Sequence, residues 1–139
     1  MRQALHTLPV ETPGAGLVEM TTPIRRWVAS QGIVTGLLTI WCRHTSASLL
    51  VQENASPDAR ADLEAFFRRI APEARGLYRH DDEGPDDMPA HLRAALTQTQ
   101  LSVPVAEGRP VLGMWQGIYL FEHRAAAHRR EVVLHLIGE

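Results

Sequence analysis

One stretch of the chain decides its fold: residues Ile33 to Cys42, which read IVTGLLTIWC. Isoleucine, valine, leucine and threonine dominate this stretch, and these residue types favour an extended strand. Apolar residues occupy both of its alternating faces, which is typical of a strand in the middle of a sheet. Gly32, directly before it, is expected to end a helix. The stretch therefore predicts a central strand with further elements on both sides.

The segments before this strand read as two strands and a helix. Short strands are predicted at residues 3–9 and 15–21, with a turn at Pro13-Gly14 between them. Thr22-Pro23 then offers an N-cap and a first-turn proline for a helix that carries Ile24, Trp27 and Val28 at helical spacing.

The second half of the chain starts with helices and ends with strands. Ser56-Pro57-Asp58 provides an N-cap, a first-turn proline and a first-turn acid for an amphipathic helix that ends before Pro72. A shorter helix is predicted from Asp87 to about Thr97. Three strands joined as hairpins are expected at residues 100–105, 111–122 and 130–137. This order predicts one compact α+β domain, residues 1–139, in which a mixed or antiparallel sheet packs with about three helices.

Composition excludes several classes of protein. A formal net charge of -2 gives no broad basic field, so no nucleic-acid partner is expected. The single cysteine, Cys42, is expected to be a small buried hydrophobe and is compatible with a reducing cytoplasm. No apolar stretch approaches the roughly 18 residues of a membrane span, so we expect a cytoplasmic protein without a membrane partner.

The segment from Tyr78 to His91 contains two histidines and five carboxylates within fourteen residues. Burying so many carboxylates is favourable only if a cation lies beside them. That cation could be a metal, an arginine or a cationic group of a substrate. Asp87 and His91 are four residues apart on the predicted helix, so the carboxylate could orient the imidazole. The alternative is a helix start that merely carries acids, because the spacing of His80 and His91 alone defines no metal site.

Three further positions carry candidate groups. If the run His44-Thr45-Ser46-Ala47-Ser48 is extended, its imidazole and two hydroxyls share one face and can contact phosphate; otherwise the hydroxyls bond to the backbone of a turn. Asn54 is either a ligand or shapes the approach to the helix cap at Ser56. Arg124 follows the apolar stretch 111–121 and is suited to a bidentate phosphate contact, with solvated surface as the alternative.

Taken together, four blocks of sequence resemble the YjbQ-like family, whose members are described as secondary thiamine-phosphate synthases. In chain order the blocks are His44–Leu49; Glu53-Asn54 with Pro57-Asp58 and Asp62–Glu64; His80 with Glu83–His91; and Gly113–Tyr119 with Glu122–Arg124. The blocks Asp86–His91 and Trp115–Tyr119 are the most specific. The resemblance covers almost the whole chain, although residues 1–30 match only in general pattern.

The resemblance implies an α+β homotrimer with a pocket of histidines and acids that can hold a divalent metal, either zinc or magnesium or manganese. It also implies a weak activity that couples hydroxymethylpyrimidine diphosphate to thiazole phosphate with release of pyrophosphate. At the matching positions, the implied metal ligands are His44, His80 and His91, and the implied catalytic acids, which orient a ligand, are Glu83 and Asp87. The implied contacts to the small phosphorylated substrate are Ser46, Ser48, Asn54, Trp115, Gln116 and Arg124.

Two other function classes stay open from the residues. The same histidines could activate water in a metal-dependent phosphoester hydrolase. Alternatively, the acidic loop seals a trimeric ligand-binding protein that has no turnover. The sequence departs from the family pattern at Ala125-Ala126-Ala127 and at Arg43, which puts the choice of substrate in doubt.

Overall fold

β3 (Gly36–Cys42) is the middle strand of a five-stranded antiparallel sheet in the computed structural model, which describes residues 1–139. The predicted central position is therefore confirmed. The strand order is β1-β8-β3-β5-β6, with β1 at Arg2–Thr12, β8 at His128–Gly138, β5 at Gln100–Ala106 and β6 at Arg109–Pro110.

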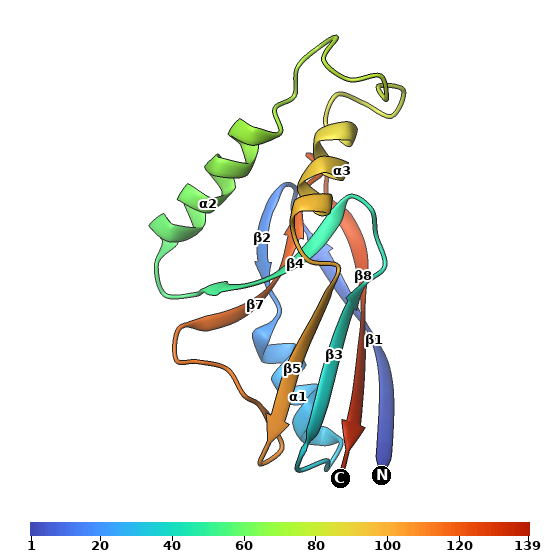
Figure 1. Ribbon diagram of the computed structural model, residues 1–139, viewed down its shortest axis with the longest axis vertical. Coiled ribbons are helices and arrows are strands. Elements are labelled where there is room, and N and C mark those ends of the chain that lie inside the picture. The colour runs from blue at the N-terminus through green and yellow to red at the C-terminus, as the bar shows by residue number, and fades with distance from the viewer.

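A second antiparallel sheet has the order β2-β7-β4, with β2 at Gly16–Glu19, β7 at Gln116–Glu122 and β4 at Ala47–Glu53. The three helices are α1 (Thr21–Ser30), α2 (Pro57–Ile70) and α3 (Asp87–Leu96). In Figure 1 the chain is elongated, with both termini at one end and the loop between α2 and α3 at the other. The predicted α+β class, antiparallel pairing and three helices are confirmed.

The main hydrophobic core lies between the two sheets and α1. Ile24 and Val28 of α1, Leu38 of β3, and Ile118 and Leu120 of β7 belong to one cluster and are fully buried. Burying each of these side chains stabilises the fold by about 1.5–3 kcal/mol. This core places β7 in the interior of the molecule, so residues at its end are held rigidly.

Helix α2 covers the opposite face of β7. Phe67 of α2 meets Phe121 edge to face, with ring centroids 5.3 Å apart, and both belong to a second cluster with Tyr119. The predicted start of α2 is confirmed, because the Ser56 hydroxyl oxygen accepts a hydrogen bond from the Ala59 amide at 3.2 Å. The stretch Gly117–Phe121 of β7 is therefore apolar because both faces of the strand are covered.

Only one face of β3 is buried, although both faces are apolar. Leu38, Ile40 and Cys42 are buried, whereas Leu37 and Trp41 on the other face are 42% and 48% exposed. The cause is that no helix or sheet of this chain covers the outer face of the five-stranded sheet. An apolar sheet face is thus open in the single chain.

The predicted late hairpins are also wrong. β7 pairs with β2 and β4, while β8 pairs with β1 and β3, so these consecutive strands belong to different sheets. The prediction assumed that sequential strands are neighbours, which is common but not general. The strand expected from Val111 starts only at Gln116. The one late hairpin is the short turn at Glu107-Gly108, where both residues have positive φ, between β5 and β6.

Helix α1 begins at Thr21, and its N-cap is Met20, which makes no side-chain cap. The prediction that Thr22 caps this helix is therefore wrong. Thr21 has the important hydroxyl: it donates to Glu19 Oε2 at 2.8 Å and accepts from the Ile118 amide at 2.9 Å. These two bonds tie the helix start to the second sheet.

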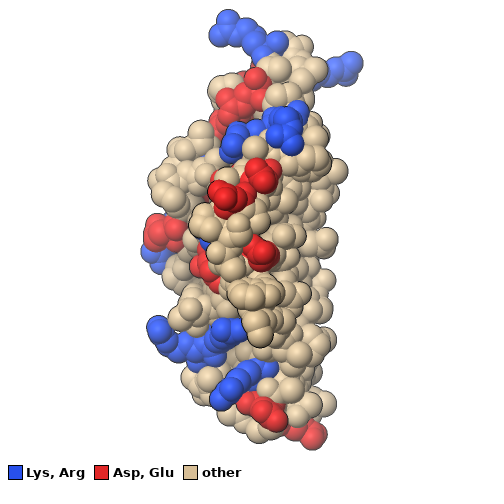
Figure 2. All heavy atoms as spheres, turned by 90° about the vertical axis from the view of Figure 1, so that its left-hand side faces the viewer, with Lys and Arg blue, Asp and Glu red and all other residues tan.

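Acidic and basic side chains are interspersed on the face of the molecule shown in Figure 2, so no charge of one sign dominates it. None of the three helices combines the length and the apolar character needed to cross a bilayer.

Candidate metal centre

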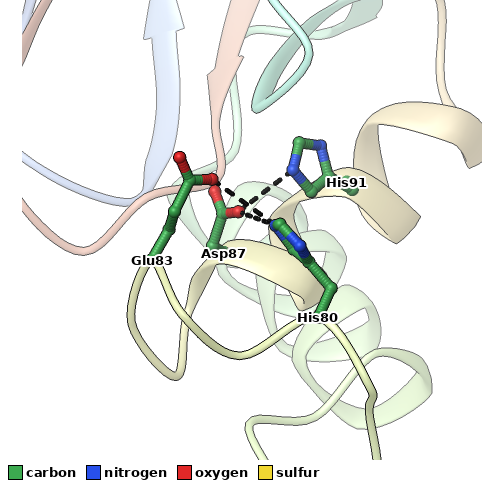
Figure 3. A group of neighbouring side chains, drawn as sticks. All are labelled: His80, Glu83, Asp87 and His91. Atoms are coloured by element: carbon green, nitrogen blue, oxygen red, sulfur yellow. Dashed lines mark hydrogen bonds and ion pairs between the residues drawn. The ribbon is translucent and has the colours of Figure 1, made fainter.

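Four potential metal ligands meet at the N-terminal end of α3. His80 and Glu83 come from the loop before the helix, and Asp87 and His91 come from its first and second turns. One ligand atom from each residue lies within 4.8 Å of the others, and all four side chains converge in Figure 3. These four residues are called the cluster below.

Asp87 is the centre of the cluster and its side chain is only 3% exposed. Its Oδ2 lies 2.7 Å from His80 Nε2 and 3.1 Å from His91 Nε2, while its Oδ1 accepts a hydrogen bond from Arg124 at 2.8 Å. Burial alone would raise the pKa of Asp87, but the hydrogen bond to His80 and the charges of His91 and Arg124 outweigh it and lower the pKa. Asp87 is therefore held ionised.

The second nitrogen of His91 fixes the protonation of its ring. Nδ1 lies 3.0 Å from the carbonyl oxygen of Thr45, which can only accept, so Nδ1 carries a proton. If the ring is neutral, Nε2 carries a lone pair that points toward Asp87 Oδ2. Both of these atoms are hydrogen-bond acceptors, so their contact would be repulsive. Either a second proton or a cation must lie between them. A carbonyl that orients a histidine in this way is the usual partner of a metal-bound imidazole.

His80 completes the exposed side of the cluster. Its Nε2 lies 3.4 Å from Glu83 Oε2, and its side chain is 41% exposed. The hydrogen bond to Asp87 is the main reason that the pKa of His80 is raised above 6.5. Because Asp87 Oδ2, 2.7 Å away, accepts a hydrogen bond, His80 Nε2 carries a proton in the place that a cation would take.

The donor set fits a divalent metal. Two ligands at about 2.1 Å from a tetrahedral ion lie about 3.4 Å apart. The three separations given above are 2.7, 3.1 and 3.4 Å, and no pair of ligand atoms in the cluster is more than 4.8 Å apart, so the close pairs need to separate by up to about 0.7 Å to admit an ion. Two imidazole nitrogens with two carboxylates favour zinc or manganese over magnesium.

Arg124 clamps the loop that carries the cluster. Its Nε donates to Asp86 Oδ2 at 3.0 Å and its third nitrogen donates to the Glu83 carbonyl at 2.9 Å, in addition to the contact with Asp87. Asp86 Oδ2 also accepts from the Ala125 amide at 2.8 Å. The Arg124 guanidinium therefore binds two carboxylates and one backbone carbonyl of this chain.

A buried ion pair between Glu122 and Arg130 stabilises the turn that carries Arg124. Glu122 is fully buried and binds Arg130 through both carboxylate oxygens. Its Oε2 also accepts the backbone amides of His123 and Arg124 at 3.1 and 3.2 Å, and its Oε1 accepts the Thr12 hydroxyl at 2.7 Å. Burial would raise the pKa of Glu122, but these partners hold it below 4.5. The end of β7 thereby fixes the turn from which Arg124 reaches the cluster.

Comparison with known proteins identifies the fold and its relatives. The family model described as UPF0047 protein YjbQ-like matches residues 6–139. The chain belongs to the YjbQ-like UPF0047 family. It is 49% identical to the UPF0047 protein sll1880 of Synechocystis, covering 99% of this chain and 94% of that protein. It is 42% identical to the UPF0047 protein YjbQ of Escherichia coli O157:H7, covering 96% of each.

The solved structures agree with this assignment. The conserved hypothetical protein TT1486 from Thermus thermophilus has a TM-score of 0.85 at 34% identity, covering 95% of this chain and 99% of that one. A YbjQ-like protein of unknown function from Sulfolobus solfataricus has a TM-score of 0.86 at 23% identity, which shows a shared fold. The family predicted from the four sequence blocks is confirmed.

Within this YjbQ-like chain, the predicted ligand His44 lies outside the cluster. Its Nε2 accepts the Glu131 amide of β8 at 2.8 Å, so that lone pair is already used. His44 does share a cavity of about 610 Å³ with Thr45 and His91. Its role as a metal ligand stays a prediction.

The predicted row of His44, Ser46 and Ser48 does not form, because β4 begins only at Ala47. The Ser46 hydroxyl accepts from Arg130 at 3.0 Å, and the Ser48 hydroxyl lies 2.8 Å from His123 Nε2. Both hydroxyls are buried and engaged inside this YjbQ-like protein, and their phosphate contacts stay predictions.

Asn54, Trp115 and Gln116 gather at the other end of the second sheet. The Asn54 amide donates to the Trp115 carbonyl at 3.0 Å, and Gln116 Oε1 accepts the Gly113 amide at 2.8 Å. The strand register separates this group from the Arg124 end by six residues of β7, or about 20 Å. In one chain of this YjbQ-like protein, the predicted substrate residues therefore form two separate groups.

Sequence reasoning missed two kinds of functional residue in this YjbQ-like chain. The Thr45 carbonyl, a backbone atom, orients His91 and leaves no signal in side-chain chemistry. Arg93 was also missed, although it falls on the buried face of α3 with Pro89 and Ala90. An arginine on an apolar helix face was the signal that could have revealed it.

Proposed function

We propose that the cluster holds a divalent metal and that this protein acts on small phosphorylated substrates as a secondary thiamine-phosphate synthase. In that reaction, hydroxymethylpyrimidine diphosphate is coupled to thiazole phosphate and pyrophosphate is released. The observation that carries the metal proposal is the meeting of Asp87 Oδ2 with two imidazoles, one of which has its other nitrogen committed to Thr45. The choice of reaction rests on the family resemblance.

The charges around the cluster explain why a cation would be needed. Asp86 and Asp87 contact one guanidinium, that of Arg124, and the charge of a third carboxylate, Glu83, also acts on it. A diphosphate would be repelled by such a site unless further positive charge were present. A divalent metal held by His80, Glu83, Asp87 and His91 would supply that charge and would stabilise the developing charge of the leaving group.

The chain's own residues would position the site. Arg124 and the Thr45 carbonyl fix Asp87 and His91, so two of the four ligands are pre-oriented. His80 and Glu83 are exposed, and their side-chain movement opens the substrate side. Asp87 and His91 thus set the geometry, while the more exposed His80 and Glu83 admit the substrate.

The test compares coupling activity and metal content in matched variants. Purified protein is supplied with the two substrates and with zinc or manganese, and formation of thiamine phosphate and pyrophosphate is measured. His91→Ala and Asp87→Asn should lose metal and coupling together, whereas His6→Ala, which removes an imidazole stacked on Trp27, should keep both. Metal loss without any coupling by the wild type would refute the reaction but leave the metal centre standing.

A metal-dependent phosphoester hydrolase is the second candidate. It is favoured by the exposure of His80 and Glu83, whose side chains are 41% and 62% exposed, because water has free access to that side of the cluster. Release of inorganic phosphate from a panel of phosphoesters, with no coupling product, would select this function.

We further propose that the active form is a homotrimer built on the open face of the larger sheet. Leu5, Leu37 and Trp41 are 71%, 42% and 48% exposed there, and contiguous apolar patches of this kind usually mark interfaces. Light scattering should give the mass of three chains for the wild type and for Phe66→Glu, an exposed control elsewhere, but one chain for Trp41→Glu.

A further inference from the structure

A second cavity, of about 280 Å³, lies between α2, α3 and the end of β7. None of the four cluster residues lines it. Phe67 and Phe121 provide apolar walls, and Arg93 and His123 provide the buried polar groups. The cavity therefore combines an apolar body with a polar end, which is the usual build of a small-molecule site.

Arg93 is a buried guanidinium without an ion pair. It is only 7% exposed, its terminal nitrogen donates to the Ala71 carbonyl at 2.7 Å, and its Nε has no hydrogen-bond partner. The other buried arginine, Arg130, is paired with the buried carboxylate of Glu122. Burying a charge without a counter-ion costs free energy. Arg93 lacks the negatively charged partner that Arg130 has in Glu122.

His123 has an unpartnered nitrogen in the same cavity wall. The ring is 1% exposed, its Nε2 bonds to the Ser48 hydroxyl, and its Nδ1 has no partner. The Ser48 hydroxyl in turn bonds to the Thr97 hydroxyl. This hydroxyl chain can point either way, so His123 Nδ1 carries either a proton or a lone pair.

The ring of His123 contributes no charge at neutral pH. Burial and the charge of Arg93 lower its pKa to about 3. The buried positive charge of the cavity is therefore that of Arg93, and Arg68 adds an exposed one. An oxyanion beside Arg93 would select the orientation in which His123 Nδ1 carries the proton and donates.

Entry to these two nitrogens requires side-chain movement, because both atoms are closed to water. The side chains of Arg68 and Glu73 line the same cavity, are exposed and form no side-chain hydrogen bond, so they are the least restrained parts of its wall. Glu73 is also the acid whose charge acts most strongly on Arg93, yet it forms no ion pair with it.

We propose that this cavity binds the oxyanion of a small organic acid, either a carboxylate or a phosphate monoester. Arg93 Nε and His123 Nδ1 donate to its oxygens, and its apolar part lies against Phe67 and Phe121. This site is separate from the cluster and needs no metal, so it goes beyond the function proposed above.

Binding is measured on the full-length protein in the presence of a chelator, by calorimetry and by NMR of the histidine rings. The probes are phenylacetate, phenyl phosphate and inorganic phosphate, which separate carboxylate from phosphate recognition and reveal what the apolar walls add. Phenylacetate or phenyl phosphate should bind more tightly than inorganic phosphate. The Nδ1 signal of His123 should take the protonated, pyrrole type when the probe binds.

Variants identify the residue responsible. Arg93→Met should weaken binding by at least about tenfold, because it removes a charged hydrogen bond. It should still fold, since exchanging a buried unpaired charge for an apolar side chain is tolerated. Arg68→Met, at an exposed arginine in the same wall, should bind within about threefold of the wild type. The proposal is overturned if no probe binds at millimolar concentration, if Arg93→Met binds as the wild type does, or if His123 Nδ1 is unprotonated in the complex with the probe.

Discussion

The substitution Glu122→Gln tests how the fold supports the site. Glu122 is fully buried and is the counter-ion of Arg130, which is itself only 5% exposed. The amide keeps the shape of the side chain but leaves the guanidinium without a negative partner in the interior. It also weakens the two backbone amide contacts at His123 and Arg124.

The expected loss of stability is large for a single substitution. Breaking a buried ion pair by removing one partner costs about 3–5 kcal/mol. For a chain of this length the entropy of unfolding is about 0.3 kcal/mol/K, so Tm should fall by about 10–17 °C. The matched control is Glu131→Gln, which removes the exposed pair with Arg43 and should cost about 0–1 kcal/mol.

Both variants are followed by differential scanning calorimetry of metal-free protein at neutral pH. A Tm for Glu122→Gln within about 3 °C of the control would refute the argument, because a loss that small is what an exposed pair gives. In that case the buried pair would not be the support on which Arg124 depends.

Three further outcomes follow from the structure. Because folding lowers the pKa of Glu122 from 4.5, the stability that its ionised form contributes is complete above pH 4.5 and is lost as the pH falls through the pKa of the folded state. Measurements of the unfolding free energy at decreasing pH should show this loss in the wild type but not in Glu122→Gln. Arg124→Met should weaken zinc binding by about 10–100-fold in chelator competition, whereas Arg129→Met, at an exposed pair, should not. Gly138→Ala should lower the unfolding free energy in urea by about 1–3 kcal/mol, because its Cβ would collide with the Thr35 carbonyl, and an unchanged midpoint would contradict that.

Local patterns predicted the elements of this fold better than their pairing. The cap at Ser56, the turn at Glu107-Gly108 and the central place of β3 follow from residue types over a few positions. The pairing of β7 with β2 and β4 depends on contacts between distant segments, which periodicity does not encode. The apolar sequence of β7 shows that its faces are covered. It does not show whether its neighbours in the sheet are β2 and β4 or the strands next to it in sequence.

The site was predicted where its residues are close in sequence. Asp87 and His91 meet because a helix brings residues four apart together, and His80 and Glu83 lie on the loop directly before it. The destination of Arg124 could not be predicted, because only the tertiary fold brings the end of β7 to the acidic loop. The same limit applies to the buried hydroxyls of Ser46 and Ser48.

Metal content is the measurement that tests the central claim most directly. Untagged wild-type protein, reconstituted and desalted, is analysed for zinc and manganese beside His80→Ala, His91→Ala and the control His6→Ala. We predict one metal ion per chain in the wild type and the control, and its loss in both cluster variants. Unchanged metal content in His91→Ala, or no metal in the wild type after reconstitution, would contradict a metal centre at this cluster.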